Sequence, residues 1–457
     1  MFAAFFRCNR RVDLKLAFVL LLFSLLGGWG CEGKTDVAWR GTVADLEKFP
    51  QNLNAFVKPE TADKPLISAS GQEAAAERYL YRFYKPWEQK KSGFSKKSMA
   101  SSTNGYAGKG SWTRNGERID PGLWTRAVDN ANVKAFPGVG WKGILVENAF
   151  LRGLPVSTPF YKNPELAGEG YPFDYLQYST LWIGTPVYVS HISRDEEWLF
   201  CETAQASGWV LSHSVSPVNE RFMDFWRTQA LGAVVKDKLP LEAGRGNAGF
   251  ASANDLRIGT LLPRQGGNFL VPVAQGVATG WQPVALPPGA AREFPVPLTP
   301  ANVAAVGNEM MGEPYGWGGL DYLRDCSAMI RDLFTPFGLW FPRNSSSQIQ
   351  IGQVRDLSFL RPADKEGMLR DFGEPFVTLV GLPGHIMLYV GQYEGRAAVF
   401  HDVWGSRTVL SDGKAGRLII GKVVVSSLEP GIEHPQVVKE ETLLNRADKM
   451  SIITVRD

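Results

Sequence analysis

Hydrophobic and polar residues alternate over short runs through the middle of the chain, which is typical of β-strands. From about residue 140, the runs GILVENAFLR, TPVYVSHI, EWLFCET and GWVLSHS are separated by turn sequences such as SRDEE and AQASG. A second series, GAVVKD, RIGTLLPRQ, NFLVPVAQ and TGWQPVAL, extends to about residue 286. Each series ends near a Gly-Trp pair, at Trp209 and at Trp281, which favours a tandem repeat of one small β fold. The pattern therefore predicts two small barrels or sandwiches, at residues 141–220 and 228–286.

Helical periodicity precedes these strands. In residues 71–90, large and small apolar side chains recur every four positions, which predicts an amphipathic helix in a partly helical N-terminal domain at 36–140. The polar, glycine-rich sequence KKSGFSKKSMASSTNGYAGKGS that follows predicts a long loop. After the strands, PPGAAREFPVP predicts an extended, semi-rigid linker over residues 287–299.

The pattern changes again after the linker. Residues 300–425 contain a glycine-rich turn, a predicted helix from Cys326, a short helix near Ser346, and strands around 376–380, 386–391 and 396–401. Helices followed by an antiparallel sheet indicate an α+β domain. Residues 426–457 predict a C-terminal extension that packs back on this domain as a helix and a strand.

The N-terminus predicts export. Basic residues precede an uncharged run from Leu16 to Leu26, and small residues follow it, which is typical of a secretory signal at residues 1–30. The run is shorter than the roughly 17 to 25 residues of a membrane-spanning helix. The expected location is therefore the periplasm or cell envelope. Gly30-Cys31 fits the end of a lipoprotein signal only in part, so a membrane tether through a lipidated Cys31 stays open as an alternative to a released protein.

Charge and cysteine content exclude several classes of protein. The formal charge of +3 comes from the signal region, so the mature chain is close to neutral and nucleic acid is not an expected partner. Because no closely spaced Cys or His groups occur, we expect neither a metal site nor a cofactor. Of the 4 cysteines, two lie in or next to the signal. A disulfide between Cys201 and Cys326 is not excluded by the sequence.

The sequence RDCSAMIRDLF places a cysteine at the start of a predicted helix. Asp325 can cap this helix, and Met329, Ile330 and Leu333 follow at the spacing of a buried stripe. Unpaired backbone N–H groups and the helix dipole favour a thiolate in a first turn, so Cys326 is a candidate nucleophile. The alternative is a buried structural cysteine.

A nucleophilic cysteine needs an imidazole within hydrogen-bond reach. His385 in LPGHIMLYVG and His401 in AVFHDVWG lie on predicted antiparallel strands joined by a turn at QYEGR, which would place them beside each other. The pattern predicts a Cys-His-His site in which His385 is the base and His401 orients it. The alternative is a pair of core histidines. The other three, His191, His213 and His434, have no nucleophile nearby in the sequence, and we interpret them as structural or surface residues.

Four ordered motifs resemble the NlpC/p60 family of papain-like bacterial cell-wall cysteine peptidases. They are Tyr-Gly-Trp-Gly-Gly at 315–319, Asp-Cys-Ser at 325–327, Pro-Arg-Asn-Ser-Ser-Ser-Gln at 342–348, and Gly384-His385. The resemblance covers roughly residues 300–425. Upstream, the chain resembles a multidomain subgroup with two bacterial SH3-like (SH3b) barrels. Departures are Ala328, where glycine is common, and a slightly short loop between Tyr315 and Cys326.

The resemblance implies a multidomain fold in which a helix bearing the cysteine packs on an antiparallel sheet, preceded by two SH3-like barrels and a partly helical N-terminal domain. It implies hydrolysis of the γ-D-glutamyl-meso-diaminopimelate amide in peptidoglycan stem peptides. Tyr315 would assist at the oxyanion, and Asp325 would bind the free amine of L-Ala while it caps the helix. Ser327 and Ser345 would line the same pocket.

Three further expectations accompany this resemblance. Arg343 is interpreted as part of an ion pair that orders its loop. If the first barrel covers the cleft, the enzyme would prefer stem peptides already freed from sugar. The alternatives are a non-catalytic peptidoglycan-binding protein, and an N-acetylmuramoyl-L-alanine amidase or transpeptidase on the same fold.

Overall fold

The computed structural model describes residues 38–241 and 252–454. The predicted signal at residues 1–30 and the candidate lipidation site Cys31 lie outside these ranges. In the described part of the chain, no helix has both the length and the apolar character that crossing a membrane requires.

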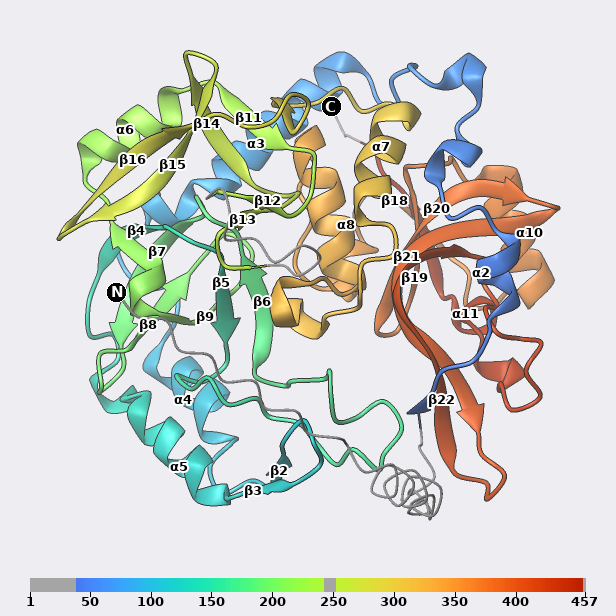
Figure 1. Cartoon of the computed structure of the whole chain (residues 1–457), viewed down its shortest axis with the longest axis horizontal. Coiled ribbons are helices and arrows are strands. Elements are labelled where there is room, and N and C mark those ends of the chain that lie inside the picture. Colours follow the sequence, from blue (N-terminus) through green and yellow to red (C-terminus); the bar gives the residue numbers. More distant parts are fainter. Residues whose placement is uncertain (1–37, 242–251, 455–457) are drawn as a thin grey trace, which may run out of the picture. The chain divides into compact units, whose positions relative to one another are not determined.

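The C-terminal part is built on a seven-stranded sheet with strand order β1-β22-β21-β20-β19-β23-β18. All neighbours are antiparallel except β1, which runs parallel to β22. The helix α8 (Cys326–Phe334) packs against β20 and β21 (Figure 1). The strands are β1 (Ala38–Trp39), β18 (Gln353–Asp356), β19 (Thr378–Leu382), β20 (His385–Tyr393), β21 (Arg396–Val409), β22 (Ala415–Ser426) and β23 (Lys449–Ile452).

Four more helices belong to this region. α7 and α9 lie before and after α8 in the chain, α10 precedes β19, and α11 precedes β23. Sequence analysis missed α7 and α10, as well as β18 and β22. The bounds are α7 (Pro300–Met310), α9 (Ser345–Gln348), α10 (Pro362–Phe372) and α11 (Leu443–Arg446).

The predicted C-terminal extension contains the helix α11 and the strand β23, and the strand is part of this sheet. β23 pairs with β19 on one side and β18 on the other. Met450 and Ile452 are buried against Val380 and Met387. Residues beyond 425 thus supply a strand of this sheet, paired on both sides, and part of its core.

The first predicted barrel is an antiparallel sheet with strand order β10-β4-β7-β8-β9-β5-β6. Its core consists of alternating strand residues, among them Leu151, Val187, Val189 and Cys201. A long segment between β5 and β6 leaves this sheet and reaches the C-terminal sheet, where Phe173 packs against Trp404 of β21. The strands are β4 (Trp141–Leu145), β5 (Ala149–Arg152), β6 (Gln177–Leu181), β7 (Pro186–Ile192), β8 (Trp198–Glu202), β9 (Ser207–Leu211) and β10 (Val215–Pro217).

The second predicted barrel is a five-stranded antiparallel sheet in the order β16-β15-β14-β11-β17, connected to the first by α6 (Glu220–Thr228). Its fifth strand, β17 (Ala291–Glu293), lies inside the stretch expected to be a linker, so that prediction was wrong at these residues. The three residues of β17 are not prolines and can therefore donate ladder hydrogen bonds, whereas the prolines on either side cannot. The other strands are β11 (Leu231–Val234), β14 (Leu261–Gln265), β15 (Asn268–Gln275) and β16 (Ala278–Val284), with a separate pair β12 (Leu239–Pro240) and β13 (Asp255–Leu256).

The N-terminal region contains the predicted amphipathic helix, α3 (Ala69–Phe83), which ends before a short 3-10 turn. The predicted long loop after it was wrong, because it contains α4 (Lys96–Asn104). Ser95 caps α4 through its side chain, and Met99 is fully buried, so one local cap and one anchor stabilise a helix of otherwise polar residues. The remaining elements are α2 (Ala44–Lys48), β2 (Ser111–Trp112), β3 (Arg118–Ile119) and α5 (Pro121–Asn130).

Part of this N-terminal region packs on the C-terminal sheet. β1 extends the edge of that sheet, and α2 lies beside it (Figure 1). The Asp45 carboxylate accepts hydrogen bonds from the Ser427 backbone N–H at 2.9 Å and hydroxyl at 2.6 Å. Segments from the two ends of the sequence therefore lie side by side.

Candidate active site

The helix that bears Cys326 begins where the sequence predicts. Asp325 has extended backbone geometry and caps α8, because its Oδ1 accepts the Ala328 N–H at 2.8 Å. The predicted stripe of Met329, Ile330 and Leu333 is fully buried. Packing on the sheet thus holds the first turn of α8, and Cys326 with it, at one end of β20.

The structure brings His385 and His401 together through the hairpin of β20 and β21. His385 Nε2 lies 2.9 Å from His401 Nδ1, and His401 Nε2 lies 2.9 Å from the Ser426 hydroxyl. That hydroxyl donates its own proton to the Ser427 carbonyl at 2.6 Å, so its oxygen must accept from His401 Nε2–H.

This chain of hydrogen bonds determines the tautomers. With Nε2 of His401 protonated, its Nδ1 carries a lone pair and accepts the proton of His385 Nε2. Neutral His385 is then left with Nδ1 as its proton acceptor. Ser426, which sequence analysis did not identify, is the group that sets this order from the next strand.

Burial keeps the reactive groups neutral. The Cys326 side chain is buried, and this burial, together with the negative charge of Asp325, raises the pKa of the thiol, although a hydrogen bond with the Ile386 backbone lowers it in part. Burial therefore opposes the thiolate that the first turn of the helix was expected to favour. Burial and then the Arg446 charge lower the pKa of His385 to about 4. Burial and then His385 hold the pKa of His401 well below its ordinary value.

Asp325 is enclosed by the protein's own donors. Oδ1 accepts from the Ser327 hydroxyl, the Ala328 N–H and Arg343 Nη1 at 2.8 to 3.1 Å. Oδ2 accepts from the Gly318 N–H at 3.0 Å and Arg343 Nη2 at 2.7 Å. Burial alone would raise the pKa of this carboxyl, but the Arg343 charge and these hydrogen bonds hold it at about 2.

These contacts bear on the role expected of Asp325. A carboxylate has about four lone-pair sites, and Asp325 accepts five internal hydrogen bonds, so binding the amine of a substrate would require it to give up one of them. Arg343 does form the ion pair that was expected of it.

The other predicted cleft residues lie in different environments. Ser327 is buried and bound to Asp325 and Arg343, and Ser345 is the half-buried first residue of α9. Neither serine is among the residues that line the cavity beside His385. The Tyr315 ring does line it and packs against Trp404, with 5.8 Å between ring centroids.

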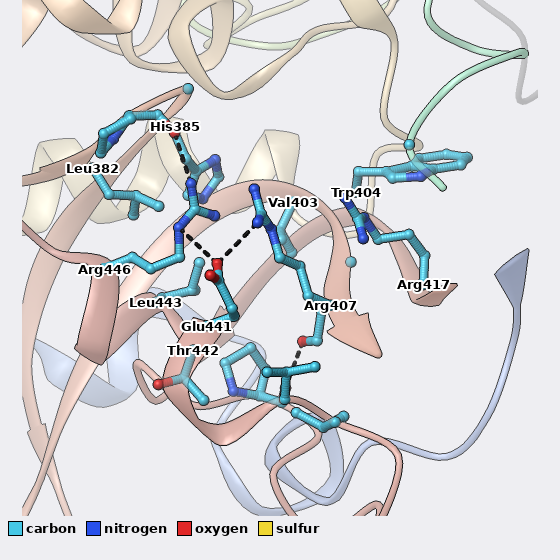
Figure 2. A pocket seen from close by; sticks show the side chains of 18 of the residues that line it. Leu382, His385, Val403, Trp404, Arg407, Arg417, Glu441, Thr442, Leu443 and Arg446 are labelled. Atoms are coloured by element: carbon cyan, nitrogen blue, oxygen red, sulfur yellow. Dashed lines mark hydrogen bonds and ion pairs between the residues drawn. The ribbon is translucent and has the colours of Figure 1, made fainter. Parts of the chain in front are cut away.

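A cavity of about 240 Å³ opens beside His385. Aromatic side chains form one wall: Phe173, Tyr315, Trp317 and Trp404. The other wall is charged, and Figure 2 shows Arg446 and Arg407 on either side of Glu441, with Arg417 beside Trp404. Sequence analysis did not identify these arginines, which come from β21, β22 and α11.

The first barrel contacts the loop before Cys326. Gln177 Nε2 donates to the Gly318 carbonyl at 3.2 Å, and Thr180 Oγ1 donates to the Gly319 carbonyl at 2.6 Å. Both glycines have positive φ, and a Cβ on either would overlap atoms of the barrel. Phe173, from the segment between β5 and β6, reaches the cavity itself. Barrel residues therefore form part of the cavity wall.

The second barrel contacts the same loop through buried charges. Arg324, directly before Asp325, bonds to Asp237, Glu313 and Asp332 at 2.7 to 3.0 Å, and it is 0% exposed. Arg257 also pairs with Asp237 and Glu313. Two arginines and three carboxylates thus connect the sheet of the second barrel to the start of α8.

Cys201 and Cys326 are both free thiols, so the pairing left open by the sequence does not form. The other histidines have structural contacts. His191 is buried against backbone carbonyls, His213 pairs with Glu147, and His434 contacts the Thr42 carbonyl. Over residues 38–241 and 252–454, no three His, Cys, Asp or Glu side chains are grouped to hold a metal ion.

Comparison with known families agrees with this architecture. A family model described as "NlpC/P60 family" matches residues 312–410, one described as "SH3 domain (SH3b1 type)" matches 159–211, and one described as "NLPC_P60 stabilising domain, N term" matches 18–136. No curated protein matches the chain.

One solved structure is similar over most of this chain. An NlpC/P60 endopeptidase from Photobacterium damselae subsp. piscicida is 25% identical, with a TM-score of 0.81 over 90% of this chain and 98% of that one. An NlpC/P60 family protein from Bacillus cereus ATCC 10987 is 15% identical, with a TM-score of 0.42 over 68% of this chain and 98% of that one. This chain therefore carries an NlpC/P60 domain of the papain-like cysteine peptidases, preceded by an SH3b domain and the N-terminal stabilising domain of that family.

Proposed function

We propose that the protein hydrolyses the γ-D-glutamyl-meso-diaminopimelate amide of peptidoglycan stem peptides, with Cys326, His385 and His401 as the catalytic group. The observation that carries this proposal is the ordered chain from His385 through His401 to Ser426, because it leaves neutral His385 with Nδ1 as its proton acceptor on β20, the strand against which the cysteine helix packs.

The proposed reaction begins from a neutral thiol and a neutral imidazole. His385 Nδ1 takes the thiol proton as Cys326 Sγ attacks the γ-carbonyl carbon, and the Cys326 N–H and the Tyr315 hydroxyl receive the oxyanion. The protonated His385 gives that proton to the leaving amine, and the C–N bond breaks. His385 then removes a proton from water, which attacks the thioester carbon; the C–S bond breaks, and His385 returns that proton to the sulfur, which restores the neutral thiol and imidazole.

Desolvation supports this neutral ground state. Because the pKa of Cys326 is raised and that of His385 is lowered, a thiolate–imidazolium pair is unfavourable until substrate charge develops. The substrate carbonyl supplies that charge only in the transition state, where the oxyanion donors act. The site would thus stabilise the transition state more than the complex with unreacted substrate.

The cavity supports a preference for stem peptides without glycan. Phe173 and Gly168, from the segment that leaves the first barrel, line the cavity together with the aromatic wall. A continuous sugar strand would have to displace this segment. A prediction from the resemblance, that the enzyme prefers a free N-terminal L-Ala, would require Asp325 to exchange one of its internal hydrogen bonds for the amine. Proteins that combine NlpC/P60 and SH3b domains typically act on cell walls, so we expect this protein to work after export.

Mass spectrometry of the products tests the proposal. The wild type should release diaminopimelate from L-Ala-γ-D-Glu-meso-diaminopimelate, and Cys326→Ala should not. Cys201→Ala is the matched control, because it removes the other buried thiol from the barrel core and should leave cleavage intact. An N-acetylated copy of the peptide tests the amine preference, and intact sacculi test the preference for freed peptides.

Three outcomes would change the conclusion. Absence of cleavage under reducing conditions would favour a peptidoglycan-binding role without catalysis. Release of the stem peptide, with L-Ala at its N-terminus, from a muramoyl substrate would identify an amidase, and a joined peptide product would identify a transpeptidase.

A further inference from the structure

The charged wall of the cavity beside His385 has more positive than negative groups. Three arginines line it, Arg407, Arg417 and Arg446, against two glutamates. One of these, Glu429, is already paired with Arg396 at 2.7 Å. The cavity therefore presents an excess of guanidinium groups a short way from the catalytic base.

Two of the three arginines have a partner. Glu441 pairs with Arg407 at 2.9 Å and with Arg446 at 3.4 Å, and Arg446 also donates to the Pro383 carbonyl at 3.2 Å. These contacts place both guanidinium groups near the start of β20, as Figure 2 shows. Their positions are thus set before any ligand arrives.

Arg417 differs from the other two. Its one hydrogen bond goes to the Gly416 carbonyl at 2.8 Å, and no carboxylate of the described residues lies within ion-pair distance. It is half-buried, and Gly168 closes over it, since a Cβ there would lie 3.2 Å from Arg417 Nη2. Burial and then the charges of Arg407 and Arg446 lower its pKa, and the Glu441 charge acts against them in part. A guanidinium that lies among like charges, with no carboxylate of the described residues at ion-pair distance, is a ready site for an anion.

The direction of the reaction identifies which part of the substrate enters this cavity. The acyl group becomes attached to Cys326, whereas the amine that leaves takes its proton from His385. The amino acid that carries that amine must therefore lie beside His385, in the cavity that the three arginines also line. Meso-diaminopimelate has a carboxylate at each end, whereas lysine at the same position has only its main-chain carboxylate.

We propose that Arg407, Arg417 and Arg446 form a subsite for a carboxylate of the released amino acid, and that Arg417 makes the enzyme select a dicarboxylic diamino acid over lysine. This inference rests on the proposed function. Glu441 fixes the positions of Arg407 and Arg446 by pairing with both. Arg417 supplies a guanidinium group to which a carboxylate can bind with two parallel hydrogen bonds.

The test compares kcat/KM on L-Ala-γ-D-Glu-meso-diaminopimelate and on L-Ala-γ-D-Glu-L-Lys. The wild type should prefer the diaminopimelate peptide by about tenfold to a hundredfold, as expected for one charge-assisted bidentate contact. Arg417→Gln should lose that preference, because the KM for the diaminopimelate peptide should rise more than the KM for the lysine peptide. Arg417→Lys, which keeps the charge without the fork, should retain part of the preference.

Controls separate folding and the source of the carboxylate. Arg361→Gln removes an arginine whose side chain is 84% exposed, and it should leave kcat/KM unchanged for both peptides. Thermal unfolding of each variant identifies loss of fold, in which case both peptides would be cut more slowly. A diaminopimelate peptide with its main-chain carboxyl amidated shows which carboxylate binds. If that peptide loses the Arg417 effect, the subsite takes the main-chain carboxylate and the selection over lysine is refuted.

The outcomes for the subsite and for the function are distinct. If the wild type cuts the diaminopimelate peptide but Arg417→Gln leaves the ratio of the two substrates unchanged, the subsite is refuted and the proposed function stands. If the wild type cuts neither peptide, the proposed function fails first.

Discussion

Replacing Asp237 with Asn should destabilise the protein strongly, because this carboxylate neutralises two buried arginines. Asp237 accepts from Arg257 at 2.9 Å through both oxygens, and from Arg324 at 2.8 and 3.0 Å. It also accepts the Ile258 N–H at 2.9 Å. The variant keeps the shape and some hydrogen bonds but loses the charge, which leaves Glu313 as the carboxylate shared by both arginines, with Asp332 beside Arg324 alone.

The magnitude follows from burial. Arg257 and Arg324 are both 0% exposed, so water cannot replace the lost charge. Removing one partner of a buried ion pair costs about 3 to 5 kcal/mol, and because Glu313 and Asp332 remain, we expect about 3 kcal/mol. Arg324 precedes Asp325 and Cys326 in the chain, so kcat should fall as well.

Urea unfolding at pH 7 measures the free energy of unfolding, and cleavage of the stem peptide measures kcat. Asp224→Asn, at an exposed position on α6, is the matched control and should change neither. A loss below about 1 kcal/mol for Asp237→Asn, with full activity, would refute the reasoning that this network holds the loop before α8.

Three further predictions concern the site. The acid limb of kcat/KM should have its midpoint near pH 4, because His385 must be neutral to act as a base and its pKa is lowered to about 4; a midpoint near 6.5 in a pH–rate profile would contradict the burial argument. Ser426→Ala should lower kcat about five- to tenfold at constant stability, because His401 loses the acceptor that sets its tautomer, and unchanged kcat would remove Ser426 from the site. Gly319→Ala should lower activity and the melting temperature together, because a Cβ at this positive φ overlaps Thr180; a melting temperature equal to that of the wild type would show that the barrel does not restrain this loop.

Features that depend on neighbours in the chain could be predicted from the sequence. The start of α8 follows from one cap, Asp325, and from an apolar stripe within three turns. The pairing of His385 with His401 follows from a single hairpin. In both cases, the residues that decide the structure lie within about 20 positions of each other.

Features that depend on distant residues could not be predicted. Arg324 finds Asp237 from a position 87 residues away, and neither has a local signal for this pairing. The raised pKa of Cys326 depends on burial under the sheet, which a first-turn argument does not contain. The arginine wall comes from three elements whose proximity is decided by strand order, so charge pattern along the chain gave no indication of it.

The strand order of the C-terminal sheet has a consequence for biosynthesis. β1 precedes both barrels in the chain, and β23 follows every other strand of the sheet (Figure 1). One edge of β19 stays unpaired until β23 has been made, and one edge of β22 pairs with β1. Because such pairings between distant segments form late and leave strand edges open meanwhile, a nascent chain that already contains Cys326 should stay inactive until translation passes β23. Any activity of this site would then appear only after β23 has been made and has paired with β19.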